Sequence, residues 1–136
     1  MKDLSKPERA VLWLLSIAMV AVGVGHFTNP EPFIRIVPAY LPAPAALVYI
    51  SGAAEIAGGV GVLLPRTRRA AAWGLILLYL AVFPANINMA IHSIQIDPNN
   101  PMPIWAMWAR LPFQALFIAT AWWFTRRRSA GHSTAV

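Results

Sequence analysis

Five polar residues lie within long apolar stretches of this sequence. Glu55 stands in ISGAAEIAGGVGVLL, with at least eight uncharged residues on each side. A charge at the centre of a membrane-spanning helix costs roughly 2.5–3.5 kcal/mol on insertion scales. Three other apolar segments contain His26, Asn86 and Arg110, and Gln114 follows Arg110 on the same helical face. Because ionisable groups inside a membrane mark ligand, substrate or proton sites, these five residues are the candidate ligand-binding cluster.

The positions of these residues along their segments predict one polar layer. His26, Asn86 and Arg110 each lie 12 or 13 residues from a tryptophan at the inner end of their segment. At 1.5 Å per helical residue, that is a height of roughly 18–20 Å. Glu55 is ten residues before Pro65, at a height of roughly 15 Å. We therefore expect the five side chains to meet between the middle and the outer third of a membrane.

Small residues surround Glu55 at helical spacing. They are Ser51, Gly52, Gly58 and Gly59. Small residues let helices approach closely in lipid, and they leave space beside the carboxylate where no helix fills it. Pro84, two residues before Asn86, leaves the carbonyl of Leu80 without its usual helical partner, which is tolerated where the helix faces protein or a cavity.

Two interpretations of the polar cluster follow. In the structural one, Glu55 and Arg110 form an ion pair that fixes helix register, and Asn86 and Gln114 form interhelical hydrogen bonds. In the functional one, the cluster binds a polar head group on an apolar body, such as a quinone or a lipid. Arg110 would then hold an anionic or carbonyl oxygen, Glu55 would balance that charge and His26 could move a proton.

The sequence contains no pattern for a metal site and identifies no catalytic residue. His92 and His132 fall in a loop and in the tail, without metal-ligand spacing around them. The chain has no cysteine, which excludes disulfides, thiolate metal sites and thiol relays within it. A redox role would need a bound cofactor or a partner subunit.

Composition predicts the elements that position the cluster. Of 136 residues, 58% are hydrophobic and 12% are charged, about half the charged fraction of a soluble domain. The apolar residues form long runs, so we expect a single all-α membrane domain over residues 1–136, an integral membrane four-helix bundle. Its spans are predicted at residues 10–25, 45–64, 70–91 and 104–125, before a polar tail at 129–136. The first segment resembles a signal peptide, but its removal would leave three spans, so we expect it to be retained.

The basic residues predict the orientation. They form three clusters, at Lys2, Lys6 and Arg9, at Arg66, Arg68 and Arg69, and at Arg126, Arg127 and Arg128. With four spans, all three clusters fall on one side, and the positive-inside rule makes both the N- and the C-terminus cytoplasmic. The net charge of +6 is thus explained by topology, and we expect no nucleic-acid partner.

The segment between the first two spans is unusual. Residues 27–44, FTNPEPFIRIVPAYLPAP, contain five prolines, which disfavour a long regular helix. The segment is also too apolar for a free loop. We expect it to lie in the outer interface or to fold back over the bundle as a lid.

The polar residues also carry a resemblance to a known family. The strings GVGHFTNPEPF, IVPAYLP, ISGAAEIAGGVGVLLPRTRRAAAWGL, VFPANINMAI and RLPFQALFIATAWW, in this order, resemble the DoxX family of small four-helix bacterial membrane proteins. This resemblance implies a multi-pass protein of the bacterial inner membrane. It also implies a non-catalytic or accessory subunit in quinone- or lipid-linked redox metabolism, with a possible redox partner subunit. By position, the family's polar motif residues fall on His26, Glu55, Asn86, Arg110 and Gln114. The missing cysteines argue against direct sulfur redox chemistry.

Two other function classes fit the same residues. One is a carrier or exporter of a small solute, which would need access to the site from both faces. The other is a membrane scaffold in which the buried Glu55–Arg110 pair is purely structural. Glycine-rich helix faces are also compatible with a homo-oligomer.

Overall fold

A computed structural model of the chain describes residues 4–126. Within that range the protein is all-helical, without a strand, which confirms the predicted all-α class. The helices are α1 (Lys6–Thr28), α2 (Glu31–Ile36), α3 (Pro44–Leu63), α4 (Arg68–His92) and α5 (Ile104–Arg126). Lys2, Arg127, Arg128, His132 and the predicted tail 129–136 lie outside the described residues.

The long helices begin and end at residues with clear local reasons. α1 starts four residues before the predicted span because Ser5 and Glu8 form a capping box, with Pro7 in the first turn. α3 starts directly at Pro44, and Ala43 before it has a φ of 49°, in the left-handed region. A residue that precedes proline is disfavoured in the right-handed helical region, so the chain cannot run into α3 as a continuous helix.

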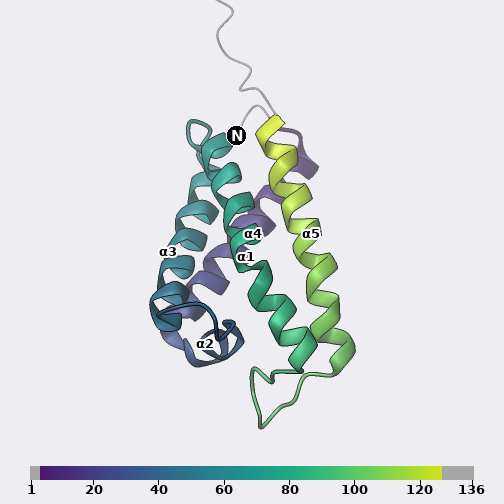
Figure 1. Ribbon diagram of the computed structural model, residues 1–136. Coiled ribbons are helices and arrows are strands. Elements are labelled where there is room, and N and C mark those ends of the chain that lie inside the picture. The colour runs from purple at the N-terminus through teal and green to yellow at the C-terminus, as the bar shows by residue number, and fades with distance from the viewer. Residues whose placement is uncertain (1–3, 127–136) are drawn as a thin grey trace, which may run out of the picture.

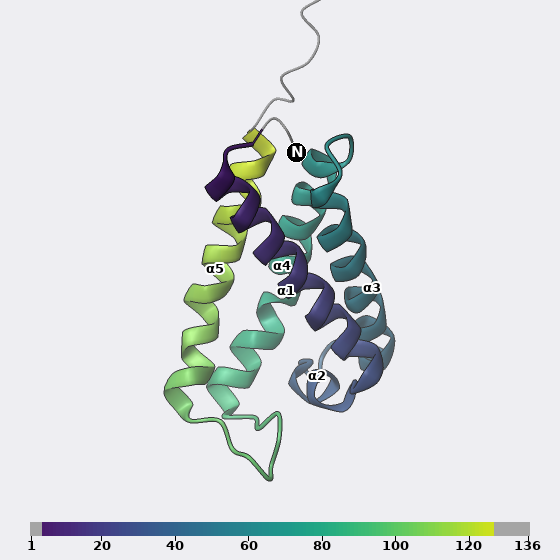
Figure 2. The ribbon, with the colours of Figure 1, turned by 180° about the vertical axis from the view of Figure 1, so that it is seen from behind.

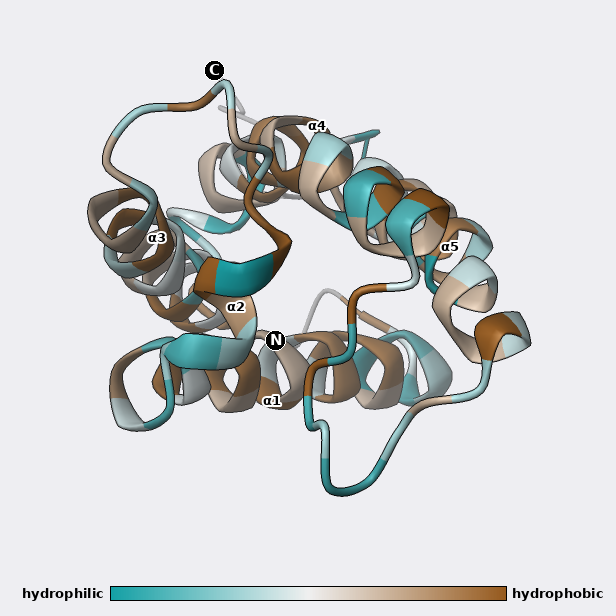
Figure 3. Ribbon diagram, turned by 60° about the horizontal axis from the view of Figure 1, so that its bottom comes forward, coloured by the Kyte–Doolittle hydropathy of each residue, from teal (hydrophilic) through white to brown (hydrophobic). Residues whose placement is uncertain are grey.

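The helices pack in chain order. α1 lies against α3, α3 against α4, and α4 against α5. The start of α1, the α3–α4 connection and the end of α5 share one end of the molecule, while α2 and the α4–α5 loop share the other (Figures 1 and 2). Figure 3, a view from the α2 end, shows the four long helices around the rim and α2 inside it, beside α3.

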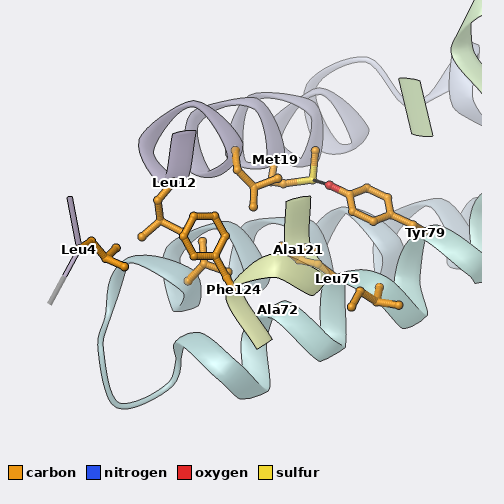
Figure 4. Packing of buried hydrophobic residues seen from close by; sticks show 11 residues of the cluster. Leu4, Leu12, Met19, Ala72, Leu75, Tyr79, Ala121 and Phe124 are labelled. Atoms are coloured by element: carbon orange, nitrogen blue, oxygen red, sulfur yellow. Dashed lines mark hydrogen bonds between the residues drawn. The ribbon is translucent and has the colours of Figure 1, made fainter. Parts of the chain in front are cut away.

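A hydrophobic core fills the end of the molecule opposite α2. Leu12 and Met19 from α1, Leu75 and Tyr79 from α4, and Phe124 from α5 are its main members (Figure 4). The Tyr79 hydroxyl donates a hydrogen bond to the sulfur of Met19, which ties α4 to α1 inside this core. α5 therefore joins the other helices chiefly at this end and through its packing on α4.

Three of the helices are long and apolar enough to cross a membrane. They are α1, α3 and α4. Large apolar side chains such as Leu14, Ile17 and Leu77 are more than half exposed on them, as expected for surfaces that face lipid. α5 has a similar length, but its tryptophans, Arg110 and Gln114 make it less apolar, so it is not one of the three. The length and apolar composition of these three helices indicate a membrane protein.

The proline-rich segment folds back over the helices. α2 has only six residues, and its last residue, Ile36, is buried against Met89 of α4 and Met107 of α5. The side-chain amide of Asn88 donates a hydrogen bond of 3.0 Å to the carbonyl oxygen of Ile36. α2 and the turn after it therefore cover the end of the molecule opposite the core.

Candidate functional site

A cavity of about 400 Å³ lies between α2 and the hydrophobic core. Its walls come from α1, α2, α3 and α4, and Arg110 of α5 completes them. The polar residues that line it are His26, Ser51, Glu55, Asn86 and Arg110. The other lining residues are apolar. Four of the five residues predicted from the sequence thus line a single cavity, and their binding of a ligand stays a prediction.

One polar wall is formed by α1 and α3. The His26 side chain is buried, and its Nδ1 lies 3.1 Å from the carbonyl oxygen of Val48 and 3.2 Å from Oγ of Ser51. Since a carbonyl oxygen can only accept, Nδ1 carries the proton. The ring also packs edge-on against Phe33 of α2, with 4.0 Å between centroids. His26 therefore connects the inside of the cavity to its cover.

Glu55 lies on the same wall, deeper in α3. Only 6% of this residue is exposed, and its Oε2 has no hydrogen-bond partner among residues 4–126. The nearest basic group is Nδ1 of His26, at 3.6 Å from Oε2, which is beyond hydrogen-bond distance. A buried carboxylate oxygen without a hydrogen bond is costly, so it marks a place where a bound group would be stabilised.

The other polar wall is formed by α4 and α5. Asn86 donates a hydrogen bond of 2.7 Å from Nδ2 to Oε1 of Gln114. Gln114 is buried, and its Nε2 donates to the backbone carbonyl of Tyr79. Gln114 does not line the cavity; it holds Asn86 in place from behind. Among residues 4–126, the guanidinium of Arg110 donates only to the sulfur of Met89, at 4.0 Å, so it has donors to spare.

The structural interpretation of the cluster included a direct ion pair between Glu55 and Arg110, and none is present among residues 4–126. Neither residue has a partner of opposite charge within 4.0 Å in the described chain, apart from the contact of Glu55 with His26. Both side chains nevertheless line the same cavity, from opposite walls. The reason lies in the packing, because α3 is held against α1 and α4, whereas α5 is attached mainly to α4.

The small residues around Glu55 make room for helices. Cβ atoms added at Gly52 and Gly59 would come within 2.6 Å of His26 and 3.0 Å of Met19, both on α1. Gly58 faces the side chain of Leu75 on α4. Ser51 alone among the four small residues lines the cavity. The space that these glycines leave is therefore filled by neighbouring helices.

Two residues of the site were not found by sequence reasoning. Asn88 was not included in the predicted cluster, and its side chain holds α2 by donating a hydrogen bond to the Ile36 carbonyl. Phe33 was part of the apolar outer segment without an assigned role, and it packs on His26. One signal could have identified Asn88. A side-chain amide near the end of a span can donate to a backbone carbonyl of a neighbouring short segment, because such a segment has few helical hydrogen bonds of its own.

The described residues contain no group of three or more metal-ligating side chains. Within residues 4–126, the His92 side chain bonds only to the carbonyl oxygen of Asn88, one helical turn earlier, at 3.1 Å. The polar groups that line the cavity are charged or hydrogen-bonding side chains in an otherwise apolar wall.

Fold and site define an all-helical membrane protein with a mainly apolar cavity and charged groups on opposite walls. The chain belongs to the family described as a domain of unknown function, DUF8561, whose model matches residues 15–125. That range contains every residue of the predicted cluster. No curated protein and no solved structure matches the sequence.

The family match corrects the resemblance to DoxX. The quoted strings are short and rich in Gly, Ala and Pro, which many membrane helices share, so their order does not distinguish one family of small helical membrane proteins from another. The match to the DUF8561 model overturns the DoxX assignment. The expected role as an accessory subunit in redox metabolism, together with its redox partner subunit, rested on that assignment and loses its basis, whereas the ligand with a polar head group was inferred from the cluster itself and stays a prediction.

Proposed function

We propose that this protein is a four-span membrane protein that binds one amphipathic, lipid-like molecule in the cavity beneath α2. α5 is its fourth span, with both termini on the cytoplasmic side of a plasma membrane. Two observations support this topology. α5 packs along α4, and Lys6, Arg68 and Arg126 lie at the same end of the molecule, as the positive-inside rule requires of a cytoplasmic face (Figure 1).

The observation that carries the proposal is the lining of the cavity. Apolar side chains from α2, α3 and α4 make up most of its wall, while Glu55 and Arg110 supply opposite charges without touching each other. Binding pockets for small molecules typically combine an apolar wall with a few polar groups that fix orientation. A lipid-like molecule has both parts, and a membrane is where such molecules are concentrated.

The shape of the cavity also favours binding over transport. Val22 and Ala81 line it and are exposed, so the cavity is open on the side between α1 and α4. Toward the other end, Met19, Leu75 and Tyr79 are buried in the core. A carrier would need a path through this packed region, and the arrangement instead resembles a pocket with one closed end.

Mass spectrometry of the protein purified in mild detergent tests the proposal. We expect one amphipathic molecule to co-purify with the wild type and with Ala57→Trp, an exposed position on α3 away from the cavity. Ala81→Trp should lose it, because the indole would occupy the cavity. If the wild type carries no such molecule and binds no added lipid, the proposal is wrong.

A further inference from the structure

The two charged walls of the cavity lie at different depths. Glu55 is the twelfth residue of α3 and Arg110 is the seventh residue of α5, and both helices start at the α2 end of the molecule (Figures 1 and 2). Counted from the start of its own helix, Glu55 is five residues further along than Arg110, or roughly 7.5 Å at 1.5 Å per residue. The cavity therefore presents a cationic group near its outer end and a carboxylate deeper inside.

Both charges are incompletely satisfied within the described chain. Glu55 is buried, and its Oε2 has no hydrogen-bond donor. The one hydrogen-bond acceptor of the Arg110 side chain in the described part of the chain is the Met89 sulfur. Two opposite charges in one apolar chamber would attract each other strongly, and their separation leaves each of them to be neutralised by something else. A bound group that carries both signs of charge would neutralise both.

We infer that the ligand has a zwitterionic head group, with an anion against Arg110 and an ammonium group against Glu55. This inference rests on the proposed function and adds the chemistry of the head group. A phosphate or carboxylate accepts the fork of guanidinium donors, and the neighbouring amide of Asn86 lies on the same wall. A primary ammonium group offers both hydrogen-bond donors and a positive charge to Oε2 of Glu55. A hydroxyl head group would offer a donor without the charge.

The alternative head groups fit less well. A purely anionic head group would pair with Arg110 and leave the buried Glu55 carboxylate facing a second negative charge. A simple amine would satisfy Glu55 and leave Arg110 without a counter-charge. His26 does not replace the ammonium as a hydrogen-bond donor to Oε2 of Glu55, because its Nδ1 proton is directed to the Val48 carbonyl.

Three matched probes test the inference on the full chain in detergent. They are dodecylphosphoethanolamine, dodecyl phosphate and dodecylamine, which share one alkyl chain and differ in the head group, which is zwitterionic, anionic and cationic, respectively. We expect the wild type to bind dodecylphosphoethanolamine at least about tenfold more tightly than either of the others, since a charge-assisted hydrogen bond contributes about one to two factors of ten. Equal affinity for all three would overturn the inference and leave the proposed function standing. Binding of none would contradict the proposed function itself.

Two variants assign the charges to their residues. Glu55→Gln should no longer bind dodecylphosphoethanolamine more tightly than dodecyl phosphate. Arg110→Gln should no longer bind dodecylphosphoethanolamine more tightly than dodecylamine. Unchanged preferences in both variants, with native helix content by circular dichroism, would overturn the inference. If a variant does not fold, the comparison of the three probes on the wild type still decides. If free phosphoethanolamine competes for the site as strongly as dodecylphosphoethanolamine does, that result would support the zwitterionic head group and identify the ligand as a soluble zwitterion.

Discussion

Nδ1 of His26 lies 3.6 Å from Oε2 of Glu55, close enough for electrostatic attraction and too far for a hydrogen bond. His26 donates its Nδ1 proton to the carbonyl of Val48 on the same helix as Glu55. The two residues thus share a wall of the cavity, but the histidine is committed to holding α1 against α3. The carboxylate is the group that remains free to meet a ligand.

We expect Glu55→Gln to leave stability unchanged or to raise it by about 1 kcal/mol, because an amide costs less to bury than a carboxylate that lacks a hydrogen bond. Thermal unfolding in detergent, followed by circular dichroism, measures the effect. A loss above about 2 kcal/mol would instead favour the interpretation in which the carboxylate is purely structural.

His26→Ala should destabilise the protein by about 1–2 kcal/mol, since it removes the hydrogen bond to Val48 and the packing against Phe33. His92→Ala is the matched control. His92 also contacts a backbone carbonyl, but it is exposed and within one helix, so its loss should change the unfolding free energy by less than about 0.5 kcal/mol. Equal effects of the two substitutions would contradict the role of His26 between α1 and α3.

Gly23→Ala tests the close approach of α1 and α3. An added Cβ would lie 2.7 Å from the carbonyl oxygen of Gly52, a backbone atom that cannot move aside, and we expect a loss of about 2 kcal/mol or more. Gly74→Ala is the control, because an added Cβ there meets no atom within 4 Å. It should stabilise α4 by about 0.5–1 kcal/mol through the better helix propensity of alanine. Chemical denaturation in mixed micelles would compare the two, and a stable Gly23→Ala protein would refute the predicted clash.

Gln114→Leu should cost about 1–3 kcal/mol, because it leaves the side chain of Asn86 and the carbonyl of Tyr79 without this partner. Thr120→Val, a half-buried position on α5 whose hydroxyl bonds within its own helix, is the comparison and should be nearly neutral. The same unfolding assay applies. Similar stability of Gln114→Leu and the wild type would mean that the α4–α5 contact does not depend on these hydrogen bonds.

Asn88→Ala should loosen the cover of the cavity. It removes the hydrogen bond to the Ile36 carbonyl, worth about 1 kcal/mol, and hydrogen exchange in residues 31–41 should become several-fold faster. Asn99→Ala, in the exposed α4–α5 loop, should leave exchange in this segment unchanged. If exchange is the same in Asn88→Ala and the wild type, Ile36 is held by its apolar contacts alone.

Much of the architecture follows from local sequence. The helix bounds depend on long apolar runs, on the capping box of Ser5 and Glu8, and on Pro44 at the start of α3, all of which act over a few residues. Helical spacing also predicted that His26, Glu55, Asn86 and Arg110 would reach a common region, because rise per residue converts position into depth. The family could not be recognised in the same way, since small residues and prolines recur in many membrane helices.

By itself, the sequence determined an all-helical chain with apolar helices, and it predicted that a set of polar residues would reach one region. Tertiary structure decided what each polar residue meets. Which helix faces another depends on side-chain packing between segments distant in sequence, so only the structure separates Glu55 from Arg110 and places His26 beside Val48. The same packing fills the glycine faces of α3 with α1 and α4 and leaves the cavity beneath α2 with its two charges apart.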